Sequence, residues 1–282
     1  MEAIGVDVGG TRIRVARVTP DGIARDLVIE AVDRTREGFA RQFARLVGGA
    51  RRAGTAGVGV GIPGRVRDGA VLSAGYLDVA GLDMAGLCGG LPARVENDAT
   101  MALMAEAHAR RERAGLVAML TVGTGIGGAI LADGQPWHGG GVAGQFGHIV
   151  VAADGPPCNC GRTGCVETLS AGPAFARLAA AHGLGEGATA DEVIARAEDG
   201  DRACGAMLAL WAAPFGRAVE TLVAAIDPRL VIVGGGLGGA MVRALERVPH
   251  RSDWFRTPVE AARLGDGAGV VGAGLLAMDR AA

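Results

Sequence analysis

Four residues whose side chains bind transition metals lie close together near the middle of the sequence: His148, Cys158, Cys160 and Cys165. Their spacing is His-x9-Cys-x-Cys-x4-Cys, with glycines that allow the chain to turn between them. Three thiolates and one imidazole make a closed tetrahedral Zn²⁺ site of the structural type. Because four protein ligands leave no open position, we expect this zinc to hold a loop and to perform no chemistry. The alternative is a set of buried free cysteines.

A first glycine cluster follows an aspartate near the N-terminus, in the order Asp7-Val8-Gly9-Gly10-Thr11. Glycines allow backbone N–H groups to face an anion, and such a nest binds phosphate without a lysine. Asp7 is suited to hold Mg²⁺ through water. An ordinary hairpin turn is the alternative interpretation of the same residues.

Two further glycine clusters have similar chemical content. The second includes Gly123, Thr124 and Gly125, and together with the first it could hold a polyphosphate from two sides. The third is Gly234-Gly235-Gly236, which follows an apolar run. It is typical of a nucleotide-binding edge, but it fits a tight strand–helix turn equally well.

Glu96-Asn97-Asp98 occurs where a predicted strand is followed by a predicted helix. Asp98 could cap that helix through its first N–H groups. In the functional interpretation, the Asp98 carboxylate accepts a proton from a substrate hydroxyl. The local sequence leaves both interpretations open.

The elements that must position these residues alternate between strands and helices, which predicts an α/β fold. We expect three strands over residues 3–30, helices over 36–53 and 99–113, a largely helical region over 172–226, and a last helix from Ala268. The hairpin of VDVGGT is echoed about 115 residues later by TVGTGIGG, which indicates two related domains. We place the first at 1–113 plus 268–282, and the second, with the zinc loop, at 114–267. We interpret Arg110–Arg113 as a solvated helix end.

Composition excludes several classes of protein. The 282 residues contain 28 arginines and no lysine, which excludes lysine-dependent P-loops and Schiff bases. A net charge of -2 and 4% aromatic residues argue against nucleic acid as a partner. No uninterrupted apolar stretch reaches about 18 residues, and the N-terminus lacks a signal-peptide pattern. Five cysteines, three of them clustered, suit a reducing compartment, so we expect a cytoplasmic protein; Cys88 and Cys204 are expected to be core residues.

The order of these motifs resembles the ROK family (repressors, open reading frames and kinases), and its bacterial glucokinase-like members in particular. The resemblance runs from Asp7 to Gly236 through Gly-Ile-Pro-Gly, Glu-Asn-Asp-Ala, Gly-Thr-Gly-Ile-Gly-Gly, Gly-His and Cys-x-Cys-Gly-x-x-Gly-Cys-x-Glu. Repressor members carry a winged helix-turn-helix before the kinase-like part. Because the phosphate motif here begins within the first ten residues, we expect no such domain.

The resemblance implies an actin-like ATPase (ribonuclease H-like) fold with two domains that close over a cleft. It implies an ATP- and Mg²⁺-dependent hexose kinase with Asp98 as general base, acting on the 6-hydroxyl. The sugar would be bound by residues shared with the family: Asn97, Asp98, His148, Glu167 and Gly64. ATP would be bound by the glycine clusters and their neighbours: Asp7, Gly9, Gly10, Thr11, Gly123, Thr124, Gly125 and, near adenosine, Gly234, Gly235 and Gly236. A symmetric homodimer is the default expectation.

Two departures from the family pattern concern recognition of the sugar. Gln145 replaces a glutamate, and an amide both donates and accepts hydrogen bonds whereas a carboxylate only accepts. The loop after Gly64 lacks the family's asparagine and carries Tyr76, a further candidate contact. The substrate is therefore glucose or a variant: an amino sugar such as kanosamine, an N-acetylhexosamine, or a C7 cyclitol or carbasugar. The donor is ATP or polyphosphate. A non-catalytic sugar sensor and a different actin-like phosphotransferase are the alternatives.

Overall fold

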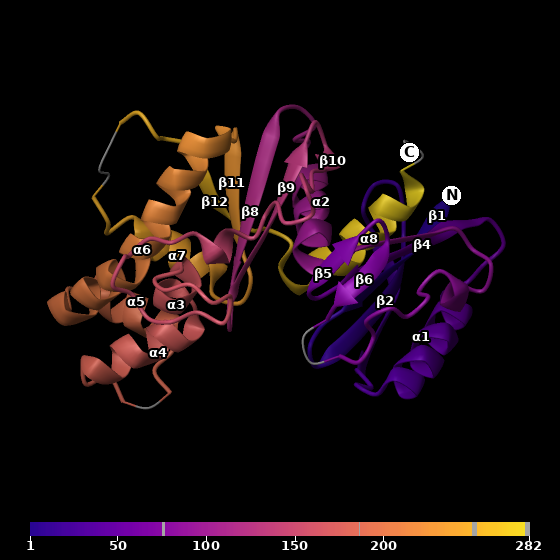
Figure 1. Ribbon diagram of the computed structural model, residues 1–282, viewed down its shortest axis with the longest axis horizontal. Helices are drawn as coiled ribbons and strands as arrows, with labels where there is room; N and C mark the ends of the chain where they lie inside the picture. Colours follow the sequence, from indigo (N-terminus) through magenta and orange to yellow (C-terminus); the bar gives the residue numbers. More distant parts are fainter. Residues whose placement is uncertain (75–76, 186, 250–252, 280–282) are drawn as a thin grey trace. The chain divides into compact units, whose positions relative to one another are not determined.

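The computed structural model describes residues 1–74, 77–185, 187–249 and 253–279. The chain divides into two compact units (Figure 1): Met1–Arg113 with Gly134–Pro136 and Leu264–Ala282, and Ala114–Asp133 with Trp137–Arg263. The division expected from the sequence differs at 134–136 and 264–267, which it assigned to the second unit. Both segments are bonded to the first unit, because the Leu264 N–H donates to Glu106 and the Gln135 amide donates to Asp279.

The first unit is built on a sheet in the order β3-β2-β1-β4-β7. β1 pairs antiparallel with β2 and parallel with β4, and β4 pairs parallel with β7. The three strands predicted over residues 3–30 are confirmed, and Asp21-Gly22 lies in the turn between the second and third. The strands of this unit are β1 (Glu2–Val8), β2 (Arg12–Val18), β3 (Ala24–Ala31), β4 (Thr55–Ile62), β5 (Arg65–Arg67), β6 (Ala70–Ser73), β7 (Ala93–Asn97) and β10 (Gln135–Pro136).

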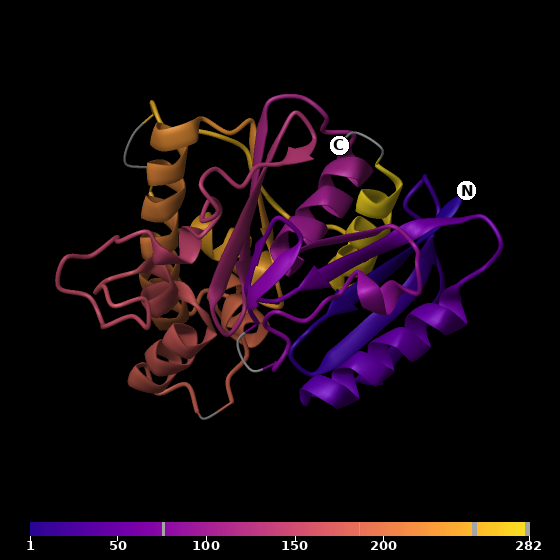
Figure 2. The same ribbon diagram turned by 45° about the vertical axis from the view of Figure 1, so that its right-hand side comes forward.

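Helix α1 (Arg36–Ala50) covers one face of this sheet, and α2 (Asp98–Arg110) and α8 (Ala268–Met278) lie side by side on the other (Figures 1 and 2). Phe39 and Phe43 of α1 pack fully buried against Ile4, Val58 and their neighbours. Short 3-10 helices span Gly86–Cys88 and Gly265–Gly267. The helices therefore hold the sheet on both faces. Asp7 lies near the end of β1 and Asp98 directly follows β7, so both acids are positioned by this sheet.

The backbone of helix α8 packs directly against the backbone of the sheet. A Cβ on Gly59 of β4 would lie 1.8 Å from the Ala273 carbonyl oxygen, and one on Gly5 of β1 would lie 2.0 Å from the Val270 carbonyl oxygen. Only residues without a side chain fit there. Part of the unusually high glycine content therefore serves packing and has no connection with ligand binding.

The second unit repeats the arrangement of the first. The second sheet runs in the order β10-β9-β8-β11-β12, with β8 antiparallel to β9 and parallel to β11, and β11 parallel to β12. The predicted echo between VDVGGT and TVGTGIGG therefore corresponds to equivalent hairpins, β1–β2 and β8–β9. The strands are β8 (Leu116–Val122), β9 (Ile126–Ala132), β11 (Leu230–Gly234) and β12 (Val259–Ala261).

The core of this unit centres on Trp211, which is fully buried and contacts Phe175 edge-on with ring centroids 5.1 Å apart. Trp211 belongs to α6, the one helix among the described residues that is long and apolar enough to cross a membrane; its buried residues include Met207 and Phe215 of the same core. The helices are α3 (Val166–Ser170), α4 (Gly172–Ala181), α5 (Ala190–Glu198), α6 (Arg202–Ile226), α7 (Gly238–Leu245) and the 3-10 helix Phe146–His148.

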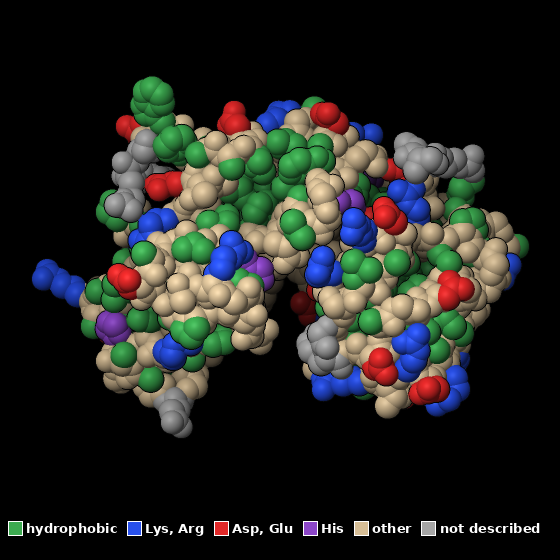
Figure 3. All heavy atoms as spheres, in the orientation of Figure 1, with side chains coloured by type: hydrophobic (Ala, Val, Ile, Leu, Met, Phe, Trp, Pro, Cys, Tyr) green, Lys and Arg blue, Asp and Glu red, His purple; other side chains and the backbone are tan. Residues whose placement is uncertain are grey.

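Two expectations about helix ends are corrected. The helices expected over 36–53 and 99–113 end at Ala50 and Arg110. The Arg110 side chain is only 3% exposed, because it pairs with the fully buried Glu106 one turn earlier, so it does not belong to a solvated helix end. Cys88 and Cys204 are buried, as predicted. Arginine and acidic side chains are mixed over the face seen in Figure 3.

Candidate functional site

Asp98 lies at the first position of α2, directly after β7. The side chain of Asn97 caps the helix, because its Oδ1 accepts the Ala99 N–H at 2.9 Å. Asp98 Oδ1 accepts the same N–H at 2.8 Å. The capping interpretation therefore applies chiefly to Asn97, and Asp98 is a partly buried carboxyl at the N-terminal end of the helix.

Burial, and to a smaller extent the negative charge of Asp7, raise the pKa of Asp98 to about 6. The hydrogen bond from the Ala99 N–H acts in the opposite direction. A carboxyl with this pKa is ionised at neutral pH and is a stronger base than an exposed aspartate. The first unit thus brings together two acids, Asp7 and Asp98, that lie about 90 residues apart in sequence.

Arg14 is bonded to the candidate site residue Asp7, a contact that the sequence did not lead us to expect. Its guanidinium donates to Asp7 Oδ2 at 3.2 Å and to Asp266 Oδ2 at 3.3 Å, and its side chain is 16% exposed. Burial raises the pKa of Asp7, and Arg14 opposes that rise. The signal was the hairpin register, since Asp7 and Arg14 are directly paired across β1 and β2.

The first glycine cluster forms the turn between β1 and β2. The Gly9 N–H donates to the Arg12 carbonyl oxygen at 2.8 Å, so this amide belongs to the hairpin and is not available to an anion. The Gly10 carbonyl oxygen accepts a hydrogen bond from Arg34. Thr11 is exposed at the tip. The prediction of a nest is therefore corrected at Gly9, and Gly10 and Thr11 are the residues able to face a ligand.

The second and third glycine clusters lie together in the second unit. Gly123, Thr124 and Gly125 form the turn between β8 and β9, with Thr124 exposed. Gly235 packs on β8, where a Cβ would lie 2.5 Å from the Val122 carbonyl oxygen. Gly234 ends β11, and Gly235 and Gly236 are exposed just before α7. Segments about 110 residues apart in sequence thus form one glycine-rich surface.

Glu167 lies beside this surface, in the short helix α3. Its Oε2 accepts the Ile126 N–H at 2.9 Å. One carboxylate oxygen is therefore engaged by the backbone next to Gly125. The resemblance assigns Glu167 to the sugar, and this hydrogen bond is a link to the glycine turn that the sequence did not predict.

The predicted metal ligands converge. The ligand atoms of His148, Cys158, Cys160 and Cys165 all lie within 4.8 Å of one another. The Cys160 and Cys165 sulfurs are 3.6 Å apart, and Cys158 Sγ is 3.5 Å from His148 Nδ1. Tetrahedral zinc with Zn–S bonds of about 2.3 Å requires sulfurs about 3.8 Å apart. Hydrogen bonds from Arg162 lower the pKa of the Cys160 thiol to about 6, which favours a thiolate ligand. The donor set therefore fits a structural zinc ion.

The remaining candidates for sugar contacts are Asn97, Gly64, Gln145 and Tyr76. The Asn97 amide donates to the Gly64 carbonyl oxygen at 2.9 Å, so β7 and the loop after β4 are joined at this point. Gln145 is exposed just before the 3-10 helix that carries His148. Tyr76 lies outside the described residues.

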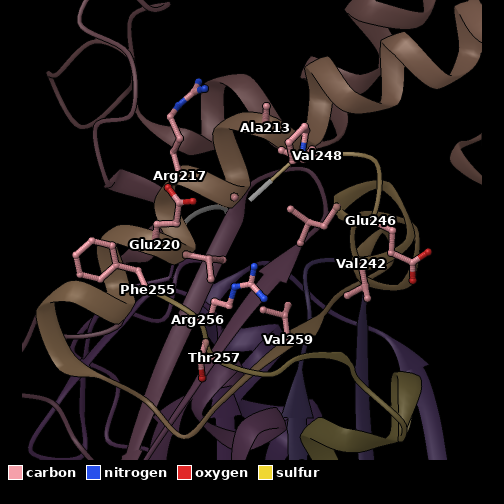
Figure 4. Close-up of a pocket in the computed structure, with 14 residues that line it drawn as sticks. Ala213, Arg217, Glu220, Val242, Glu246, Val248, Phe255, Arg256, Thr257 and Val259 are labelled. Atoms are coloured by element: carbon pink, nitrogen blue, oxygen red, sulfur yellow. The ribbon is translucent and has the colours of Figure 1, made fainter. Parts of the chain in front are cut away.

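A separate cavity of about 610 Å³ lies between α6, α7 and the segment before β12 (Figure 4). Arg217 and Glu220 of α6, Val242 of α7, and Phe255 and Arg256 are among its lining residues. None of the residues predicted to bind substrate, nucleotide or metal lines it.

Comparison with known proteins gives consistent results over the whole chain. The ROK family model matches residues 3–280. The N-acetylmannosamine kinase of Escherichia coli (strain 55989 / EAEC) is 31% identical over 293 residues, covering 98% of each chain. The ROK hexokinase from Thermus thermophilus has a TM-score of 0.82 and 30% identity, covering 98% of this chain and 97% of the other.

A ROK family glucokinase from Streptomyces griseus, solved in complex with glucose and AMPPNP, has a TM-score of 0.76 and 31% identity over 98% of this chain and 99% of that one. ROK sugar kinases have the actin-like ATPase fold, and the repeated sheets of the two units are that fold. The family resemblance seen in the motifs is thus confirmed along nearly the full length, and the chain belongs to the ROK family.

Proposed function

We propose that this protein is an ATP-dependent kinase that transfers the γ-phosphoryl group to the 6-hydroxyl of a hexose or hexose-like alcohol. The observation that carries the proposal is Asp98, a partly buried acid with a pKa raised to about 6 in a chain whose relatives are named as sugar kinases. A sugar-binding protein without catalytic activity has no need of a base tuned in this way.

In the proposed reaction, the substrate hydroxyl oxygen attacks the γ-phosphorus and the bond to the ADP oxygen breaks. The hydroxyl proton passes to the Asp98 carboxylate. General base catalysis of this kind contributes on the order of 10²- to 10⁴-fold. The rest of the acceleration comes from position and charge, because phosphoryl transfer needs little covalent help from the protein.

The phosphate groups would be held by backbone N–H and hydroxyl groups of the glycine turns, and the chain has no lysine to add to them. Gly10 and Thr11 in the first unit and Thr124 and Gly125 in the second are the exposed or partly exposed candidates. Mg²⁺, when bound, neutralises phosphate charge, and Asp7 would hold it through water. Arg14 keeps Asp7 oriented, while Gly269 leaves room for the carboxyl, since a Cβ there would lie 2.6 Å from Asp7 Cγ.

The adenosine would lie against the exposed Gly235 and Gly236. The sugar would be bound by Asn97, His148 and Glu167, with Gln145 as the residue that changes specificity. The zinc ion would fix the loop that carries His148 and Glu167. Gln145 brings an amide where family members commonly have a carboxylate. We therefore propose that the acceptor is either glucose or one of three variants: an amino sugar, an N-acetylhexosamine or a carbasugar.

The test is a coupled ADP-release assay with a panel of acceptors: glucose, mannose, N-acetylmannosamine, a 3-amino hexose and a C7 cyclitol. Phosphorylation of at least one acceptor is expected, and the Asp98→Asn variant should lose nearly all turnover while still binding the acceptor. If no acceptor is phosphorylated with ATP or polyphosphate, yet a sugar raises the melting temperature, the protein is a sensor and the proposal is wrong.

A further inference from the structure

The turn between β8 and β9 is attached at both ends to the stretch of chain that directly follows Cys165, the last of the metal ligands. At one end, the Ile126 N–H donates to Glu167 Oε2 at 2.9 Å. At the other, the Gly123 carbonyl oxygen accepts the Gly172 N–H at 2.7 Å. Gly147 also lies against the turn, because a Cβ on it would be 2.0 Å from the Ile126 carbonyl oxygen. All of these residues belong to the second unit.

Glu167 is tied closely to the metal cluster. It is the second residue after Cys165, which precedes α3 as its N-cap. Val166 between them is fully buried, and its N–H donates to the carbonyl oxygen of Ile149, the neighbour of His148. The Glu167 backbone is therefore fixed by the same two segments that present the metal ligands.

A side chain at Gly125 would push the Glu167 carboxylate away from its present position. A Cβ on Gly125 would lie 2.5 Å from Glu167 Oε2. A hydrogen bond from a backbone N–H to an ionised carboxylate is also stronger than one to a neutral acceptor. The Glu167 carboxylate is thus hydrogen-bonded to the backbone immediately beside Thr124 and Gly125.

We infer that Glu167 is a positioning residue for the phosphate-binding turn. Through the Ile126 N–H it holds Thr124 and Gly125 in place, and it links the His148–Cys165 metal cluster to nucleotide affinity. The inference rests on the proposed function only in assigning this turn to the nucleotide. It gives Glu167 a role that is separate from any contact with the sugar.

The test compares Glu167→Gln with Glu167→Ala. The glutamine amide oxygen still accepts the Ile126 N–H, whereas alanine has no acceptor. We measure the Kd of mant-ADP with MgCl₂ by fluorescence, without sugar, and the zinc content of each variant. Loss of a hydrogen bond to a charged group predicts that the Kd of mant-ADP rises by about 10-fold or more in Glu167→Ala. Glu167→Gln should stay within about threefold of the wild type, with both variants retaining zinc.

Asp154→Asn is the matched control, since Asp154 is exposed in the same segment and the change also converts a carboxylate to an amide. It should bind mant-ADP like the wild type. Should Glu167→Ala lose zinc, Glu167→Asp takes its place, because it keeps the charge but shortens the reach by one methylene. The same loss of nucleotide affinity is expected for that variant.

A double-mutant cycle with Gly125→Ala gives an independent check. The new Cβ should weaken nucleotide binding strongly beside Glu167 and much less in the Glu167→Ala background. Wild-type affinity in Glu167→Ala, equal losses in the glutamine and alanine variants, or additive effects in the cycle would each overturn the inference. If the wild-type protein itself fails to bind mant-ADP, both the proposed kinase function and the role of Glu167 are wrong. If the wild type binds mant-ADP and the variants behave as just described, only the role of Glu167 is wrong.

Discussion

Asp98→Asn should make the protein more stable at neutral pH while it abolishes turnover. The reason is the cost of keeping a charged carboxylate in a desolvated position near Asp7. A pKa difference of one corresponds to about 1.4 kcal/mol, so the rise of the Asp98 pKa from 3.8 to about 6 corresponds to about 3 kcal/mol of lost stability. Asparagine carries no charge and its Oδ1 can still accept the Ala99 N–H.

The sign follows from linkage. Because the folded-state pKa of Asp98 is raised, its stabilising effect is complete below pH 3.8 and is lost as pH rises through about 6. The advantage of Asp98→Asn should therefore be fully developed at pH 8, fall to about half at pH 5 and to about a fifth at pH 4. At pH 8 the gain is equivalent to a rise in melting temperature on the order of 5 °C.

The assay is urea unfolding and differential scanning calorimetry of wild type and Asp98→Asn at pH 4, 5, 6.5 and 8, beside the coupled kinase assay. Asp21→Asn, an exposed carboxyl of the first unit, is the matched control and should show no stability gain. If Asp98→Asn is less stable than the wild type at pH 8, the assignment of a desolvated carboxylate with a raised pKa is refuted. Turnover above a few per cent of wild type would refute the assignment of Asp98 as base.

Three further predictions concern catalysis, metal and packing. The acid limb of the kcat/KM profile should titrate near pH 6, because Asp98 must be ionised to accept a proton; a flat profile between pH 5 and 8 would contradict this. Cys165→Ser should lose the zinc ion, as measured by atomic absorption, and lower the melting temperature; full zinc content would show that the four residues do not form the site. Gly59→Ala should destabilise the protein by about 1–3 kcal/mol or more, because its Cβ meets the Ala273 carbonyl oxygen. Gly48→Ala, with open space around it in α1, should stabilise by about 0.5–1 kcal/mol, and equal effects of the two changes on urea midpoints would contradict the packing argument.

The elements that could be predicted were those with a strong local pattern. The apolar run of β1, the alternation along β2, and the spacing of Phe39 and Phe43 in α1 can each be read within one element. The short strands β5, β6 and β12 were missed because three or four residues carry no distinct period. The helix ends were misjudged because the backbone leaves the helical conformation at Arg51 and Arg111, and the pattern of apolar side chains does not mark these positions.

The sequence by itself determined the chemistry that is available: three thiolates and an imidazole at metal spacing, an acid near the end of each of two strands, and glycine turns in an order shared with the ROK family. Only the tertiary structure decided how these groups are used. The raised pKa of Asp98, the engagement of Gly9 within its own hairpin, and the seating of Glu167 on Ile126 all depend on contacts with residues brought close by folding. A local pattern specifies which groups are present, whereas electrostatics and hydrogen bonding act through space, and those distances exist only once the chain has folded.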